Sequence, residues 1–179
     1  HHRKQEPMIT IEQLSAAAAE ALIEPVLIPL LQTVVDDGAS IGFIAPLAAD
    51  EAREYWQGIL GPLQAGHKLL LMANIDGKPV GAVQLALEPR ANGRHRAEVQ
   101  KLMVHTAARG HGVGRRLMEA VEAAARTHGR TLLVLDTRRG DVADGLYARM
   151  GYTQVGVIPK YAMSSAGHLS DTVFYYREL

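Results

Sequence analysis

The fold is decided by the stretch Glu98-Val-Gln-Lys-Leu-Met-Val-His-Thr-Ala-Ala-Arg-Gly-His-Gly-Val-Gly-Arg-Arg-Leu-Met118. Apolar residues 102–104 end a predicted strand, and a glycine-rich turn follows them. Apolar side chains then recur at helical spacing, at positions 113, 117, 121 and 124, until His128-Gly129 supplies a polar last turn and a left-handed stop. The stretch predicts a strand, a glycine turn and a helix that begins inside the glycine run.

The glycine turn has the features of an anion site. Gly110, Gly112 and Gly114 carry no side chains, so a ligand can approach the peptide amides closely. Unpaired N–H groups and the positive end of the helix dipole favour an anion there, and Arg109 adds a full charge. No Gly-x4-Gly-Lys-Ser/Thr run exists, and position 115 is Arg where a dinucleotide fingerprint needs Gly. We interpret the turn as a cradle for a diphosphate of another kind.

The run Arg109–Gly114 matches the Q/R-x-x-G-x-G/A signature of the GCN5-related N-acetyltransferase (GNAT) family. The strand at 102–104, a buried strand at 132–135 and a short helix at 146–152 fall where that family places them. The chain therefore resembles the GNAT family. From about Gln32 onward it resembles, within the family, an acetyltransferase of toxin-resistance type, with which it shares stretches at 38–43, 96–104, 135–137 and 167–169.

The resemblance implies an α+β fold: a mixed, mostly antiparallel sheet whose central parallel strands splay around acetyl-CoA, flanked by helices. The residues agree, because a strand, a helix and an apolar strand at 131–136 predict parallel pairing with a right-handed connection. Asp76-Gly77 predicts a hairpin turn. The remaining predicted elements are hairpin strands at 67–75 and 79–87, helices at 50–63 and 142–150, and closing strands at 152–158 and 172–178.

The N-terminal region is predicted to hold a strand at 8–11 and two helical pieces. Thr10 and Gln13 have the spacing of a capping box for the first helix, and Pro25 is expected to end or kink it. The apolar run at 25–35 is shorter than the roughly 20 residues that span a bilayer, so we expect a buried helix. Residues 1–7 look like a tag or vector remnant, which leaves one predicted domain at 8–179.

The composition of the chain excludes several kinds of binding partner and site. The 179 residues include 19 Lys and Arg and 19 Asp and Glu, so the formal net charge is zero, which argues against nucleic acid or an anionic membrane as a partner. The absence of cysteine excludes disulfides, thiolate metal sites and a cysteine nucleophile, and the histidines lack metal-site spacing. We expect no metal, a cytoplasmic location, and a monomer or homodimer.

By the resemblance, acetyl-CoA is the cofactor and coenzyme A the product. Pantetheine would lie between the splayed strands, bonded by backbone groups of Leu102 and Val104, and the Leu102 N–H is our candidate for the oxyanion donor. The alternative is that both are only core strand residues. The predicted cofactor-binding residues are Leu102, Met103, Val104, Arg109, Gly110, His111, Gly112, Val113, Gly114 and Arg115.

Tyr147 matches the tyrosine that the family uses as a general acid toward the coenzyme A sulfur. A phenol with a pKa of about 10 can donate to a nascent thiolate at neutral pH. The alternatives are that Tyr147 only packs its helix on the sheet, or that Tyr152 or Tyr161 serves instead. Tyr161 and His168, in the last loop, could also line the acceptor pocket.

Two carboxylates are candidate bases. Polar residues in a central strand that should be apolar on both faces predict a wet cleft, and strict alternation places Glu98 and Gln100 on the face that carries Leu102 and Val104. Glu98 could take the amine proton directly or through water, or it could only pair with Arg96 or with a cation on a neighbouring strand. Asp136, at the carboxyl end of its strand, is the other candidate; otherwise it caps the following loop.

These residues predict an enzyme that moves acetyl from acetyl-CoA directly to a primary amine, with no acyl-enzyme because the chain lacks cysteine. The predicted acceptor is a small, amino-acid-like molecule. One alternative keeps the chemistry but takes a protein N-terminus or a polyamine as acceptor. Another is a module that senses acyl-CoA without turnover.

Overall fold

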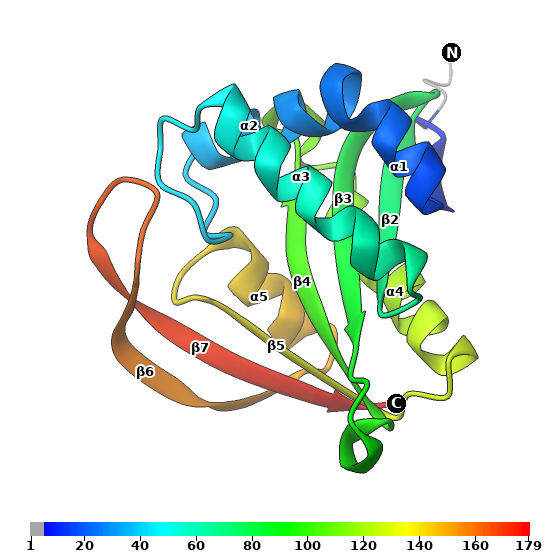
Figure 1. The fold of residues 1–179 in the computed structure, drawn as a ribbon. Helices are drawn as coiled ribbons and strands as arrows, with labels where there is room; N and C mark the ends of the chain where they lie inside the picture. Colours follow the sequence, from blue (N-terminus) through cyan, green and yellow to red (C-terminus); the bar gives the residue numbers. More distant parts are fainter. Residues whose placement is uncertain (1–5) are drawn as a thin grey trace, which may run out of the picture.

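The computed structural model describes residues 6–179, which form a seven-stranded sheet with helices on both faces (Figure 1). The strand order is β1-β2-β3-β4-β5-β7-β6, and only β4 and β5 pair in parallel among these neighbours. The predicted α+β fold is confirmed. The strands are β1 (Ile9–Gln13), β2 (Lys68–Ile75), β3 (Lys78–Leu87), β4 (Arg96–Val104), β5 (Leu132–Arg138), β6 (Thr153–Met163) and β7 (Leu169–Glu178).

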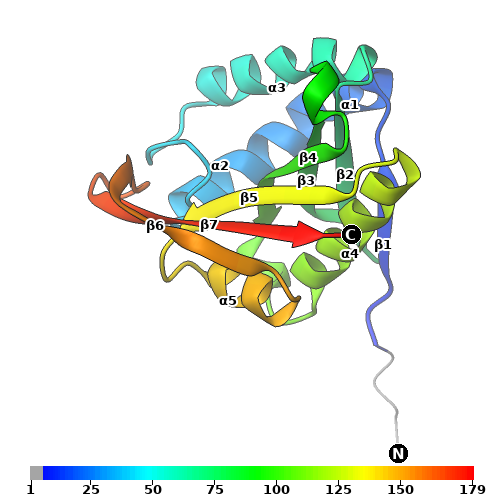
Figure 2. The ribbon, with the colours of Figure 1, turned by 90° about the horizontal axis from the view of Figure 1, so that it is seen from below.

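The sheet is the middle layer of three (Figure 2). One face is covered by α1 (Ala16–Leu22), the π-helix η1 (Ile23–Leu27), α2 (Ile28–Asp36) and α3 (Ala49–Gln64). The other face is covered by α4 (Val113–Thr127) and α5 (Val142–Arg149). Short 3₁₀ turns at Ala91–Gly93 and Thr106–Ala108 precede β4 and the glycine loop. Of the predicted tag, residues 1–5 lie outside the described residues, and Glu6 and Pro7 are exposed.

The predicted capping box is wrong. Thr10 and Gln13 both lie in β1, where they pair with Asn74 and Leu71 of β2. The first helix is instead capped by Ser15, whose hydroxyl accepts a hydrogen bond from the Ala18 N–H at 3.1 Å. The pattern misled because β1 continues through Gln13, so Thr10 cannot stand at a helix start.

The regular α-helix α1 stops at Leu22, before Pro25, in agreement with the expected end or kink of the first helix. Pro25 lies inside η1, a five-residue π-turn, and the chain continues into α2 without leaving helical geometry. A π-turn widens the helix locally, so it can accommodate the missing amide and the pyrrolidine ring. The Ile28 N–H donates to the Ile23 carbonyl across this turn.

The resulting helical segment, Ala16–Asp36, is longer than the apolar run seen in the sequence. At 21 residues and a mean hydropathy of 1.5 over its most apolar window, it has the length and composition of a membrane span. However, 44% of that window is buried inside the protein. Leu27 and Leu31 are fully buried, and the Trp56 Nε1–H of α3 donates to the Leu27 carbonyl at 2.9 Å. Its apolar composition is thus used in packing, as expected of a core helix.

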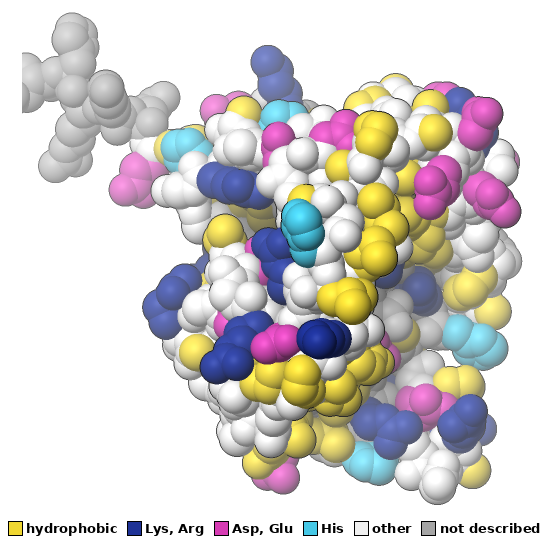
Figure 3. All heavy atoms as spheres, turned by 90° about the vertical axis from the view of Figure 1, so that its left-hand side faces the viewer, with side chains coloured by type: hydrophobic (Ala, Val, Ile, Leu, Met, Phe, Trp, Pro, Cys, Tyr) yellow, Lys and Arg dark blue, Asp and Glu magenta, His cyan; other side chains and the backbone are white. Residues whose placement is uncertain are grey.

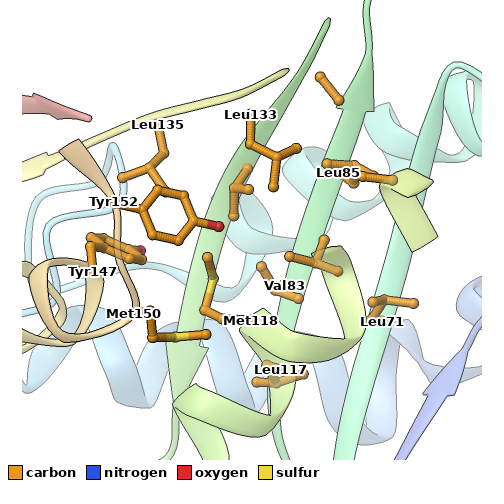
Figure 4. Packing of buried hydrophobic residues seen from close by; sticks show 14 of the residues in the cluster. Leu71, Val83, Leu85, Leu117, Met118, Leu133, Leu135, Tyr147, Met150 and Tyr152 are labelled. Atoms are coloured by element: carbon orange, nitrogen blue, oxygen red, sulfur yellow. The ribbon is translucent and has the colours of Figure 1, made fainter. Parts of the chain in front are cut away.

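Two hydrophobic cores lie on opposite faces of the sheet. The core under α4 and α5 includes Leu117, Met118 and Tyr147, packed on Val83 and Leu135 of the sheet (Figure 4). The second core joins α1, η1, α2 and α3 to the other face. A residue's assignment to one core or the other therefore shows which face of the sheet it occupies.

β4 contains a bulge that overturns the predicted alternation. On β3 one residue separates Ala82 from Gln84, whereas on β4 two residues separate their partners Met103 and Gln100. Lys101 supplies the extra position and adopts a left-handed backbone with φ +55°. An inserted residue shifts all later side chains to the other face.

The bulge separates residues that were predicted to share a face. Leu102 and Val104 pack with the core under α4, as do Ala97 and Val99, whereas Met103 belongs to the core under the other helices. Glu98 lies opposite Ala86, and Gln100 opposite Gln84, whose amide reaches Tyr55 of α3. Glu98 and Gln100 thus face α3, and Leu102 and Val104 face α4.

Leu117 provides a test of the core under α4. It is 0% exposed, so Leu117→Ala should lower the free energy of unfolding by about 2–5 kcal/mol through lost burial and a residual cavity. Leu169→Ala, at a residue that is 59% exposed, is the matched control and should change it by less than about 0.5 kcal/mol. Urea unfolding measures both, and equal effects would contradict the packing of α4 on the sheet.

Candidate functional site

The parallel pair β4–β5 opens after three residue pairs. Arg96 pairs with Leu132, Ala97 with Leu133 and Glu98 with Val134, and no further residues of the two strands pair. Beyond Glu98, the rest of β4 has no described strand on its β5 side. The splayed strand pair that the sequence predicted is therefore present.

A cavity of about 340 Å³ occupies this opening. Its lining residues come from six parts of the chain that lie far apart in sequence. They are Ser40–Gly42 before α3, Tyr55 of α3, Lys68 of β2, Glu98–Leu102 of β4, Asp136–Arg138 with Asp141, Ala143 and Tyr147 of β5 and α5, and Tyr161, Ala162 and Thr172 of β6 and β7. The predicted cleft is thus found, and it holds all three predicted catalytic residues.

The two predicted bases face the same side of the cavity. Val134 pairs with Glu98, and Asp136 lies two residues further along β5, on the same face as Val134. Both carboxylates are exposed to the cavity, and neither forms an ion pair within 4.0 Å among residues 6–179. Arg96, the predicted alternative partner of Glu98, instead pairs with Glu88 at 3.5 Å.

The surroundings of the Asp136 carboxylate favour its acceptance of a proton. Burial raises the pKa of its carboxyl above the ordinary value, while the nearby positive charge of Lys101 opposes this shift. A raised pKa makes a carboxylate a stronger base.

The charged lining also contains Arg138 and Asp141, which pair with each other at 3.7 Å, and two lysines, both of which the sequence analysis missed. Lys101 lies near the rings of Phe43 and Tyr55, with its Nζ 5.8 and 5.7 Å from their centroids. Lys68 lies in the same cross-strand row as Glu98, through Ala86 of β3. Burial lowers the pKa of both ammonium groups. The signal for Lys101 was the consecutive pair Gln100-Lys101, which no alternating strand should contain.

Tyr147 of α5 reaches the cavity from the side of the α4 core. It is buried, and its ring lies next to that of Tyr152 (Figure 4). The distance between ring centroids is 5.8 Å to Tyr152 and 5.9 Å to Tyr175. Its hydroxyl has no hydrogen-bond partner in the part of the chain that the structure describes. Burial, assisted by Asp141 and Asp136, raises the pKa of the phenol above its ordinary value, so it remains protonated at neutral pH.

The other two candidate tyrosines differ from Tyr147. The Tyr152 hydroxyl donates to Glu122 of α4 at 3.0 Å and does not line the cavity. Tyr161 does line the cavity, but it is 53% exposed and stacks edge-on against Phe174 at 5.4 Å. His168 is exposed and is not among the cavity-lining residues. Of the three tyrosines, only Tyr147 combines burial with a place on the cavity wall.

The glycine turn has the geometry of an open cradle. Gly110 and Gly112 have left-handed φ angles of +84° and +76°, and a Cβ at either position would meet no atom within 4 Å. Gly112 is the N-cap of α4, and its carbonyl accepts from the Arg116 N–H at 3.1 Å. Amides of the first turn have no partner inside a helix, and this first turn contains no acidic residue to compete for them.

The side chains around the turn are consistent with anion binding. Arg109, His111 and Arg115 are exposed, and the two arginines form no ion pair among the described residues. Val113 is buried and anchors the helix start in the core. Gly114 has a different role from the one expected, because a Cβ there would lie 3.3 Å from Leu146. Gly114 permits close packing of α4 on α5.

The β4 residues predicted to bind a cofactor are placed differently from one another. Leu102 lines the cavity and has no paired residue on β3 or β5. Met103 is 2% exposed in the second core and pairs with Ala82. Val104 packs toward α4 and pairs with Gly81. Among these three, Leu102 alone is a cavity-lining residue.

The described residues contain no group of three or more His, Asp or Glu side chains arranged to hold a metal ion. On the face seen in Figure 3, basic and acidic side chains are interspersed with apolar ones, without a field of a single sign.

A family model described as the acetyltransferase (GNAT) family matches residues 36–152, which is more than half of the chain. The chain belongs to the GNAT family. The matched range includes the glycine cradle, Glu98, Asp136 and Tyr147. The resemblance inferred from the sequence is thereby confirmed at the level of the family.

Relatives of this GNAT protein carry acetyltransferase names. An uncharacterized N-acetyltransferase in the hisH-hisA intergenic region of Azospirillum brasilense is 36% identical over 106 residues, 58% of this chain and 61% of the relative. An IAA acetyltransferase of the same organism is 28% identical over 123 residues, 62% of this chain and 78% of the relative. The match thus spans less than two thirds of the first relative's length.

Solved structures show the same fold. The structure of yncA from Salmonella typhimurium with its cofactor acetyl-CoA superposes with a TM-score of 0.74 at 21% sequence identity. The match covers 96% of this chain and 94% of that chain. At this identity the likeness establishes the GNAT fold and nothing finer.

Titration of the tyrosines tests the burial of this region. Burial raises the pKa of Tyr55, Tyr147 and Tyr152, and burial with a hydrogen bond to Asp144 raises the pKa of Tyr175 to about 12. In the native protein, the absorbance of the phenolate form should therefore rise at higher pH than it does in urea. In urea the chain is unfolded, and its six tyrosines titrate near the ordinary pKa of about 10.

The same shifts predict how stability changes with pH. Above about pH 10 the unfolded chain releases tyrosine protons before the folded chain does, so the free energy of unfolding should fall as pH rises further. Coincident native and urea titration curves would contradict the burial of these four phenols.

Proposed function

We propose that this GNAT protein is an N-acetyltransferase that moves the acetyl group of acetyl-CoA directly to a primary amine of a small molecule. The observation that carries the proposal is the cavity beside the unpaired half of β4, whose lining residues include Glu98, Asp136 and Tyr147. These groups are a base, a second base and a protonated phenol, the set that acetyl transfer from a thioester to an amine requires. Membership of the GNAT family supports the reaction class.

The chain offers a site that fits acetyl-CoA. Gly110 and Gly112 leave open space above left-handed backbone, and the first turn of α4 presents free amides without an acidic competitor. Arg109 and Arg115 would add charge for a diphosphate, and His111 lies beside them. The Leu102 N–H, on the unpaired part of β4, is the proposed donor to the acetyl carbonyl oxygen. When bound, acetyl-CoA supplies the acetyl thioester.

The remaining steps use residues of this chain. Glu98 or Asp136, directly or through water, takes a proton from the incoming ammonium so that the amine can attack. A nitrogen–carbon bond forms and the carbon–sulfur bond breaks. The departing thiolate takes a proton from Tyr147, which regains one from solvent, and both protons lost by the nitrogen pass in turn through the base to solvent. The products are an N-acetyl amide and coenzyme A.

A small acceptor fits the size of the cavity. A volume of about 340 Å³ lies at the lower end of the range for small-molecule sites. Shared stretches at 38–43, 96–104, 135–137 and 167–169 resemble the tabtoxin resistance protein, an acetyltransferase of this family, which supports an amino-acid-like acceptor. Cytoplasmic location, a monomeric or homodimeric state and a single domain at 8–179 stay predictions from the sequence.

The direct test is amine-dependent release of coenzyme A from acetyl-CoA. The amines would be amino acids, amino-acid-like antibiotics, polyamines, aminoglycosides and short peptides, with products identified by mass spectrometry. An acetylated small molecule is the expected result. If only peptides or polyamines are acetylated, the acceptor belongs to those classes and not to the small amino-acid-like molecules. If acetyl-CoA binds but no acetyl group is transferred, the protein is a sensing module.

The cradle can be tested by a matched pair of glycine variants. Gly112→Val places a branched side chain in the proposed diphosphate space, so it should weaken binding of coenzyme A by about tenfold or more. Gly129→Val is the control, because Gly129 has a similar φ of +69° and open surroundings at the other end of α4. Calorimetric titration measures both, and equal losses would mean that helix strain, not the cradle, is responsible.

Tyr147→Phe tests the general acid. Loss of the proton donor should lower kcat by about 100-fold while the dissociation constant of acetyl-CoA stays within about twofold. Tyr161→Phe, which removes the other cavity-lining phenol of the three candidates, should retain most of the turnover. Unchanged turnover in Tyr147→Phe would remove this residue from the mechanism.

A further inference from the structure

The ammonium group of Lys101 is held in place without a counter-charge at contact distance. It is half-buried between the rings of Phe43 and Tyr55, at 5.8 and 5.7 Å from their centroids. In residues 6–179, neither Lys101 nor Lys68 forms an ion pair within 4.0 Å. Glu98 and Asp136 act on the Lys101 ammonium from beyond ion-pair distance, so its N–H groups can still donate to an anionic ligand.

The backbone is arranged to put this cation in the cavity. Lys101 occupies the bulge of β4 at φ +55°, a left-handed conformation that is unfavourable for a residue with a Cβ. A regular strand would have directed position 101 toward the α4 core, because Gln100 faces α3. Gly42 contributes as well, since a Cβ there would lie 3.1 Å from the Lys101 Nζ.

The anion is not the diphosphate of the proposed cofactor. The glycine cradle begins α4, on the opposite face of the sheet from Tyr55 and α3 (Figure 2). Lys101 and Lys68 are grouped with Tyr55, Glu98 and Asp136 in the cavity, whereas the cradle residues from Arg109 to Arg115 are not among its lining residues. The lysines are therefore positioned for a different ligand group.

The cavity carries charges of both signs in one small volume. Lys68 and Lys101 are positive, and Glu98 and Asp136 are negative, with no contact ion pair among these four in the described structure. Burial lowers the pKa of both ammonium groups, and the charge of Lys101 lowers that of Lys68 further. Asp136 and Glu98 favour the charged form of Lys101, and Glu98 favours that of Lys68. A ligand with an anionic and a cationic end matches this arrangement.

We propose that Lys101, assisted by Lys68, binds a free carboxylate of the acceptor while Glu98 and Asp136 receive its amine. The acceptor class is then an amino acid or short peptide with an unblocked carboxyl group. This inference rests on the proposed acetyl transfer and deepens it, because it excludes polyamines and amidated peptides as preferred acceptors. Lys101 acts as a specificity residue, with no part in the transfer of protons.

The test compares acceptors that differ only in the carboxylate. Each of several L-amino acids and dipeptides is paired with its carboxamide, and kcat/KM is measured for acetylation by the full chain with acetyl-CoA. The wild-type protein should prefer the free acid by about tenfold or more. Lys101→Met should bring the ratio near one, mainly by raising KM for the acid, and Lys101→Arg should retain part of the preference.

Two controls exclude a general effect of removing a lysine and misfolding of the variant. Lys78→Met removes an exposed lysine of β3 that does not line the cavity, and it should leave the ratio unchanged. Binding of coenzyme A and the thermal midpoint verify that Lys101→Met is folded. An acid preference that survives in Lys101→Met overturns the inference, as does a wild-type protein that favours amides or polyamines. Equal loss of kcat for acids and amides also overturns it.

Failure of the proposed function is distinguished by a binding measurement. Saturation-transfer NMR reports whether the same acids and amides bind to the protein saturated with coenzyme A. Absence of any acetylated product refutes the transfer reaction, while selective binding of acids that is lost in Lys101→Met still supports the carboxylate site. Equal binding of acids and amides refutes the site.

Discussion

One extra residue in β4 determines the arrangement of the rest of the site. At Lys101 the backbone is left-handed, and two residues of β4 stand where β3 has one. Before this point, Glu98 and Gln100 face α3; after it, Leu102 and Val104 face α4. A regular strand would have put Lys101 in the α4 core, where an unpaired ammonium would be strongly unfavourable. The bulge places polar groups in the cavity and leaves both cores apolar.

The cavity exists because β4 and β5 part after only three pairs. Bulges bend strands and end regular pairing, and this one follows the last pair by three residues. The two cores then hold the separated strands in place from opposite faces: α4 and α5 on one, α1 to α3 on the other. In the proposed reaction, the α4 side holds coenzyme A, the α3 side holds the acceptor, and Tyr147 approaches from α5.

Interactions that depend on neighbouring residues were predicted well from the sequence. Gly129 ends α4 at φ +69° and Asp76-Gly77 forms the hairpin turn, both as predicted. The helix predicted at 142–150 is present as α5, capped by Asp141 through the Val142 N–H at 2.8 Å. The glycine cradle also belongs to this group, because its conformation follows from residues within one turn. The exception, Thr10-x-x-Gln13, arose where the tertiary pairing of β1 with β2 overrode a short pattern.

The sequence by itself determined the family, the cradle, the parallel strands with their helix, and the candidates Glu98, Asp136 and Tyr147, because each is encoded by local spacing or by a polar residue in an apolar strand. Only the tertiary structure decided that these three line one cavity, that Lys68 and Lys101 join them, and that Met103 lies in a core. The physical reason is that side-chain direction along a strand depends on register with its neighbours. A single inserted residue reverses that direction for every later residue of the strand. The insertion becomes visible only in the pairing of β4 with β3, which joins residues that are far apart in the chain.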